Sequence, residues 1–111
     1  ILPIKIKKMG LFQHLFGGGQ TEDLKTIITQ GAYLVDVREP NEFANGTAKG
    51  AVNIPLGTIV AQLTKFKNKK NIIVFCRSGN RSRQAKIILA QNGIQDVING
   101  GTWENVSRFV H

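Results

Sequence analysis

The sequence is poor in several kinds of residue, and each shortage excludes a class of protein. Cys76 is the only cysteine among 111 residues, so the chain forms no internal disulfide and the common cysteine-based zinc and iron–sulfur sites are excluded. No apolar run approaches the ~20 residues of a membrane-spanning helix. We therefore predict one cytoplasmic domain that acts as a monomer, holds no metal or cofactor and does not enter a membrane.

Acidic residues are scarce as well. The chain has 7 Asp and Glu against 15 Lys and Arg, a formal net charge of +8, which raises nucleic-acid binding as an interpretation. The lysines of the N-terminal tail and of residues 65–70 lack the interleaved aromatic residues on which bases would stack. We expect no nucleic-acid partner. Residues 65–70 are interpreted as a solvated loop, with docking of an acidic protein partner as the alternative.

The first twenty residues differ in composition from the rest of the chain. The sequence does not start with Met, and we take Met9 as a native start, so residues 1–8 would derive from a vector or from a longer precursor. Residues 17–19 are three glycines, which are typical of a flexible joint. We predict a tail over residues 1–20 and a folded domain over residues 21–111. A trimmed precursor would leave a periplasmic location open.

Short β-branched runs alternate with helical patterns through the predicted domain. Strands are predicted at residues 33–37, 51–54, 71–75 and 96–98, and helices at residues 21–30, 56–66, 84–91 and 103–109, with a turn at residues 40–46. This alternation is typical of an α/β fold with a mostly parallel sheet and helices on both faces. Ligand sites of such folds lie beyond the carboxyl ends of the strands. Three polar segments follow predicted strands and should therefore meet at one rim: residues 38–39, the loop after Cys76 and residues 99–101.

Cys76 stands between a predicted buried strand and a polar loop that leads into a helix. We expect Gly79 and Asn80 to take positive φ, which would turn backbone N–H groups inward as an anion cradle, and Ser82 to cap the helix. The helix dipole and the nearby arginines favour the thiolate, whereas burial opposes it. We interpret Cys76 as a catalytic nucleophile rather than a structural thiol, with a pKa below that of a free thiol.

Several residues around this loop could bind an anionic substrate. Arg77 and Arg81 flank the cradle and would attract an anion. Arg38 could bind substrate as well, and the alternative is a structural role in which it pairs with the charge of Asp36. The predicted substrate-binding residues are Arg38, Arg77, Ser78, Gly79, Asn80, Arg81 and Ser82.

Four segments occur in an order that resembles the rhodanese-like, single-domain sulfurtransferases. They are residues 34–39 (Leu-Val-Asp-Val-Arg-Glu), 50–55 (Gly-Ala-Val-Asn-Ile-Pro), 73–82 (Ile-Val-Phe-Cys-Arg-Ser-Gly-Asn-Arg-Ser) and 99–103 (Asn-Gly-Gly-Thr-Trp). The resemblance implies a five-stranded parallel sheet flanked by helices. It also implies transfer of sulfane sulfur, through a persulfide on Cys76, from a small anionic donor such as thiosulfate to a thiol or cyanide-like acceptor. A persulfide carrier or docking module with little turnover on thiosulfate is the alternative function.

Two details qualify the resemblance. The family commonly has His where this chain has Thr47, so we expect altered packing near Gly46. Phosphatases and arsenate reductases of the same fold carry Cys-x5-Arg, whereas Cys76 and Arg81 are spaced as Cys-x4-Arg. The shorter loop suits one sulfur atom on the cysteine better than a tetrahedral oxyanion, and therefore favours the sulfurtransferase interpretation.

Overall fold

The computed structural model describes residues 24–111, which form a four-stranded parallel sheet with strand order β2-β1-β3-β4. Its strands are β1 (Tyr33–Asp36), β2 (Val52–Asn53), β3 (Ile72–Cys76) and β4 (Val97–Thr102). Each strand lies on one of the four predicted runs, so the α/β fold and the parallel sheet are confirmed. The fifth strand implied by the resemblance is wrong for the described residues. Outside the four strands, the buried apolar residues of this part of the chain reach the core from helices and loops rather than from a fifth strand.

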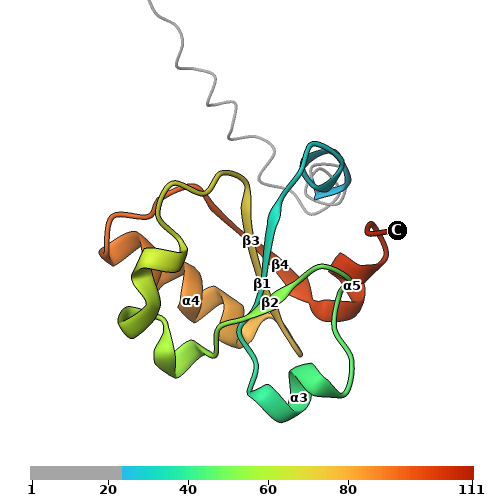
Figure 1. The fold of residues 1–111 in the computed structure, drawn as a ribbon, viewed down its shortest axis with the longest axis horizontal. Helices are drawn as coiled ribbons and strands as arrows, with labels where there is room; N and C mark the ends of the chain where they lie inside the picture. The colour runs from blue at the N-terminus through green and yellow to red at the C-terminus, as the bar shows by residue number, and fades with distance from the viewer. Residues whose placement is uncertain (1–23) are drawn as a thin grey trace, which may run out of the picture.

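Helices cover both faces of the sheet, as predicted (Figure 1). Alternate side chains of a strand point to opposite faces, and β3 divides its residues in this way. Val74 and Cys76 belong to the core on the side of α4 (Asn80–Gln91), whereas Ile73 and Phe75 belong to the core on the side of α5 (Trp103–Ser107) and of helical residues 24–29. The sulfur atom is therefore directed to the α4 face. No helix of residues 24–111 is long and apolar enough to cross a bilayer. The predicted helix start at Thr21 lies outside the described residues.

The helix predicted for residues 56–66 is wrong in type. The segment forms two 3₁₀ helices, η1 (Leu56–Thr58) and η2 (Val60–Lys65). The Thr58 hydroxyl donates to the Pro55 carbonyl oxygen at 2.8 Å, which tightens the first turn. Gln62 has a non-helical backbone, with φ −121° and ψ 28°. These local interactions replace the i→i−4 ladder of an α-helix, while Ile59 and Phe66 still reach the core.

The helix after the cysteine loop starts earlier than predicted. Gly79 is its N-cap, with φ 95°, and Asn80 is already its first residue. Positive φ is therefore confirmed for Gly79 and wrong for Asn80. The expected cap by Ser82 is also wrong, because the Ser82 side chain is buried and turned inward. Once Gly79 reverses the chain, residues 80–82 have no steric reason to leave the helical region.

The last strand is longer than predicted and carries a bulge. The sequence predicts residues 96–98, whereas β4 continues to Thr102, with an irregularity opposite Val74 and Phe75. A Cβ on Gly100 would lie only 2.6 Å from Val106 Cγ2, so glycine permits the close packing of α5. The strand therefore carries Asn99 to the same rim as Cys76. The short helix α3 (Pro40–Ala44) follows β1 at this rim (Figure 1).

Candidate active site

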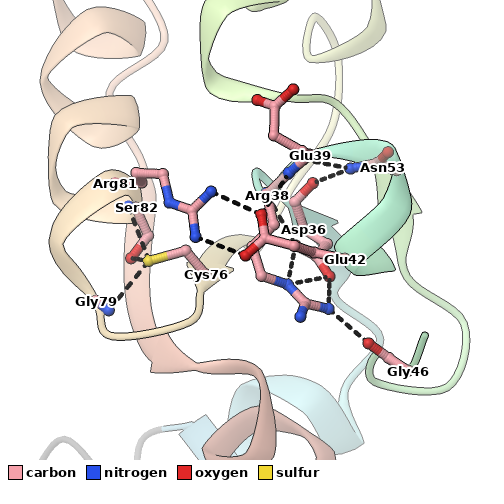
Figure 2. Close-up of polar contacts among 10 residues, drawn as sticks. All are labelled: Asp36, Arg38, Glu39, Glu42, Gly46, Asn53, Cys76, Gly79, Arg81 and Ser82. Carbon is pink, nitrogen blue, oxygen red and sulfur yellow. Dashed lines mark hydrogen bonds and ion pairs between the residues drawn. The ribbon is translucent and has the colours of Figure 1, made fainter. Parts of the chain in front are cut away.

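The thiol of Cys76 is surrounded by hydrogen-bond donors. Cys76 is the last residue of β3 and is fully buried. The Gly79 N–H donates to Cys76 Sγ at 3.0 Å and the Ser82 N–H at 3.4 Å, while Ser82 Oγ lies 3.5 Å from the sulfur (Figure 2). Both N–H groups belong to the turn at the N-terminus of α4, where backbone donors have no partner within the helix. The inward-facing donors predicted for this loop are therefore present.

Glycine is required at position 79 of this loop. The φ of 95° lies in the left-handed region that side chains disfavour, and this backbone conformation, rather than a lack of space for a Cβ, is what favours glycine. This conformation lets the chain pass from β3 into α4 within three residues, Arg77, Ser78 and Gly79. The loop is therefore short enough for the N–H groups of Ser78, Gly79 and Ser82 to act on the same sulfur atom.

Two opposing effects act on the ionisation of Cys76. Burial raises the pKa of the thiol, but the Ser82 hydroxyl and the backbone N–H groups of Ser82, Ser78 and Gly79 lower it. The donors outweigh burial, so the pKa of Cys76 lies below its ordinary value, in the predicted direction. A thiolate is the nucleophilic form of cysteine, and the site therefore favours a reactive sulfur.

Asn99 holds the cradle from the neighbouring strand, a role that the sequence interpretation missed. Its Oδ1 accepts from the Ser82 hydroxyl at 2.7 Å and from the Gly101 N–H at 2.9 Å. Its Nδ2 donates to the Gly79 carbonyl oxygen at 3.2 Å. Asn99 thus fixes both ends of the turn that binds the sulfur. The sequence analysis did predict that residues 99–101 lie at the same rim as the Cys76 loop, but it gave Asn99 no contact there.

Arg81 is paired with an acidic residue that the sequence interpretation also missed. Its Nη1 and Nη2 donate to Oε1 and Oε2 of Glu42 at 2.8 and 3.0 Å (Figure 2). This bidentate pair, together with the Glu39 N–H, lowers the pKa of Glu42 to about 2. The same pair raises the pKa of Arg81. Glu42 lies 39 residues before Arg81 in the chain, and only the adjacency of β1 and β3 brings them together.

Arg38 is directed into the protein rather than toward the sulfur. Its Nε and Nη2 bind the buried Asp36 carboxylate, and Nη2 also donates to the Gly46 carbonyl oxygen. Thr47 Oγ1 donates to Asp36 Oδ2 at 2.7 Å, so the residue that departs from the family pattern joins the same network. The hydrogen bond to Asp36 raises the pKa of Arg38. These contacts are the ones expected if Arg38 has a structural role as the partner of Asp36. Substrate binding by Arg38 stays a prediction.

The remaining predicted residues lie at the mouth of the loop. Arg77, Ser78 and Asn80 are exposed beside the turn that holds Cys76. Asn80 Oδ1 accepts from Arg83 Nη2 at 3.1 Å. Residues 24–111 contain no group of three or more His, Cys, Asp or Glu side chains arranged to hold a metal ion. The site thus consists of a sulfur atom, N–H and hydroxyl donors, and a rim with arginine side chains.

Comparisons with known proteins agree with this architecture. Residues 20–104 match the family model of the Rhodanese-like domain. The chain is 35% identical over 71 residues to a sulfurtransferase of Allochromatium vinosum, covering 64% of this chain and 66% of that protein. It is 33% identical over 75 residues to the thiosulfate sulfurtransferase PspE of Escherichia coli, covering 66% of this chain and 72% of that protein.

A solved structure shows the same fold. The human single-domain sulfurtransferase TSTD1 superposes with a TM-score of 0.63 at 27% identity, covering 76% of this chain and 88% of that one. The chain spans only about half to two thirds of the length of some curated relatives that it matches.

Proposed function

Because the chain belongs to the rhodanese-like domain family, we propose that it is a sulfurtransferase that carries sulfane sulfur as a persulfide on Cys76. The observation that carries the proposal is the set of donors around one sulfur atom, which lower the pKa of a fully buried thiol. A structural thiol would need no such donors. The names of the relatives in Allochromatium vinosum and Escherichia coli support the same chemistry.

The first half-reaction loads the enzyme. The Cys76 thiolate attacks the outer sulfur of thiosulfate, a new S–S bond forms, and the S–S bond of the donor breaks with its electron pair leaving on sulfite. One thiolate and one dianion thus give one persulfide anion and one sulfite dianion, so no oxidant or reductant is needed. The Gly79 and Ser82 N–H groups stabilise the Cys76 thiolate that attacks the donor.

The second half-reaction unloads the enzyme. A nucleophilic acceptor, such as a thiolate or cyanide, attacks the terminal sulfur of the persulfide, and the electron pair of the broken S–S bond returns to Cys76. The donors that favour the thiolate make Cys76 a good leaving group in this step. We propose thiosulfate as the donor because PspE carries that substrate in its name.

Mass spectrometry of the protein after proteolytic digestion tests the proposal. After incubation with thiosulfate, the peptide that contains Cys76 should gain the mass of one sulfur, ~32 Da, and lose it again when cyanide is added. Cys76→Ser, in which a hydroxyl replaces the thiol, should gain no mass and should retain no more than a few per cent of the thiosulfate:cyanide turnover. A wild-type chain that stays unmodified by thiosulfate and by other sulfane donors would refute the function.

Turnover separates the enzyme from the alternative carrier. The enzyme should form thiocyanate catalytically, whereas a carrier should form persulfide once per chain with negligible turnover. Hydrolysis of an aryl phosphate that depends on Cys76 would instead point to an oxyanion enzyme of the same fold.

A further inference from the structure

The pair between Glu42 and Arg81 stands directly beside the sulfur cradle. Arg81 follows Gly79 by two residues in the turn that binds Cys76 Sγ. Its guanidinium is directed to Glu42, as Figure 2 shows, with both nitrogen–oxygen contacts at 3.0 Å or less. About a third of the Arg81 side chain and a quarter of the Glu42 side chain are exposed. At Arg81, an entering anion therefore meets a paired arginine rather than a free cation.

Glu42 is held in this position by its own helix. Its Oε1 accepts from the Glu39 N–H at 2.9 Å, and the two residues form a capping box at the start of α3. Pro40, the first residue of that helix, restricts the backbone further. Because Glu42 is fixed before any ligand arrives, its carboxylate neutralises Arg81 without a large entropic cost.

The charge at the rim is therefore lower than the number of arginines indicates. Within residues 24–111, Arg38 and Arg81 each form an ion pair, and no other ion pair is formed. Arg77 is the exposed arginine next to Cys76 that has no acidic partner within this part of the chain. Thiosulfate has two negative charges, and its attraction to the rim depends on the net charge that it meets.

We propose that Glu42 is a specificity-determining residue that neutralises Arg81 and thereby favours sulfur donors with a single negative charge over dianionic donors. The inference rests on the sulfurtransferase function proposed above. It assigns a charge preference to that site: singly charged sulfane donors should be better substrates than the dianion thiosulfate, which remains a donor. A carboxylate beside the entry path penalises each negative charge of the donor, so a dianion is penalised about twice as strongly as a monoanion.

Steady-state kinetics of Glu42→Gln with two donors test this assignment. Thiosulfate serves as the dianion and benzenethiosulfonate as the monoanion, with cyanide as the acceptor. Glu42→Gln should lower the KM for thiosulfate by about 3- to 10-fold and the KM for benzenethiosulfonate by a clearly smaller factor. The difference should shrink in 0.5 M KCl, because salt screens exposed charges.

Two further variants separate charge from packing. Glu42→Asp keeps the charge but shortens the side chain, so its KM for thiosulfate should stay within about twofold of the wild type. Arg77→Ala should raise the KM for thiosulfate several-fold, which shows that the assay responds to charge at the rim. An unchanged or higher KM for thiosulfate in Glu42→Gln would overturn the assignment, and so would equal changes for both donors.

The persulfide assay distinguishes a failure of the proposed role of Glu42 from a failure of the sulfurtransferase function. If wild-type Cys76 gains no sulfur from either donor, the sulfurtransferase function fails. If Cys76 is loaded normally but Glu42→Gln does not discriminate between the donors, only the role of Glu42 fails.

Discussion

At the scale of single residues, the Ser82 hydroxyl is the main group that lowers the pKa of Cys76. This hydroxyl lies 3.5 Å from the sulfur and donates to Asn99 Oδ1 at 2.7 Å. A hydroxyl has one proton to donate. When Cys76 ionises, that proton can turn toward the thiolate, and the Gly101 N–H still donates to Asn99 Oδ1. We therefore expect the Ser82 hydroxyl to donate to the sulfur once Cys76 is ionised.

Ser82→Ala should raise the pKa of Cys76, because burial already disfavours the thiolate and the Ser82 hydroxyl is the main donor that opposes it. The measurement is the pH dependence of alkylation by iodoacetamide. At pH 6 the variant should react about 3- to 10-fold more slowly than the wild type. Ser78→Ala is the matched control, since Ser78 acts on the sulfur through its backbone N–H, which alanine keeps. A midpoint that does not rise in Ser82→Ala would assign the effect to the backbone alone.

At the scale of elements, the short turn between β3 and α4 sets the size of the cradle. One Gly inserted between Ser78 and Gly79 would convert Cys-x4-Arg into Cys-x5-Arg and move the Gly79 and Ser82 N–H groups relative to the sulfur. Preorganised donors lose much of their effect when they are displaced by about an ångström. Thiosulfate:cyanide turnover should therefore fall by at least ~10-fold, which corresponds to ~1.4 kcal/mol of transition-state stabilisation.

The control for this prediction is a Gly inserted between Lys69 and Lys70, in an exposed turn before β3 and at the other end of that strand from Cys76. It adds the same residue without touching the cradle, so its turnover should match the wild type. Intact sulfur transfer in a folded Ser78–Gly79 insertion variant would mean that loop length does not separate sulfurtransferases from oxyanion enzymes on this fold.

At the scale of the whole molecule, the buried pair of Asp36 and Arg38 joins distant parts of the chain. Asp36 receives the Thr47 hydroxyl, Arg38 donates to the Gly46 carbonyl oxygen, and the Arg38 guanidinium lies 5.3 Å from the centre of the Trp103 ring. The pair therefore connects β1 with the segment after α3 and with α5.

Arg38→Ala should destabilise the domain by about 3–5 kcal/mol, because it leaves the fully buried Asp36 carboxylate without its cation. Urea denaturation gives the free energy of unfolding. Arg83→Ala is the matched control, since Arg83 is exposed and its side chain forms a hydrogen bond only to Asn80 among the described residues. It should change stability by less than about 0.5 kcal/mol. If Arg38→Ala were stable but had a raised KM for thiosulfate, the predicted substrate-binding role of Arg38 would replace the structural one.

The sequence by itself determined the local features of this protein. Four short runs that contain Val and Ile predicted where the four strands lie, because β-branched side chains fit the pleated surface of a sheet. The order of strand, cysteine, glycine-containing loop and helix predicted the inward donors, because Gly79 permits a backbone conformation that few other residues adopt. These properties depend on neighbours within a few positions, which a sequence displays directly.

The sequence predicted that residues 99–101 and the Cys76 loop share a rim, but only the tertiary structure decided which side chains pair there. The strand order β2-β1-β3-β4 places α3 beside the cysteine loop, so Glu42 neutralises Arg81, and it places β4 on the other side, so Asn99 holds Ser82. Neither pairing follows from spacing, because the partners are 39 and 17 residues apart and the patterns of the strands do not specify their order. The net charge that a substrate meets at Cys76 is therefore a property of the fold.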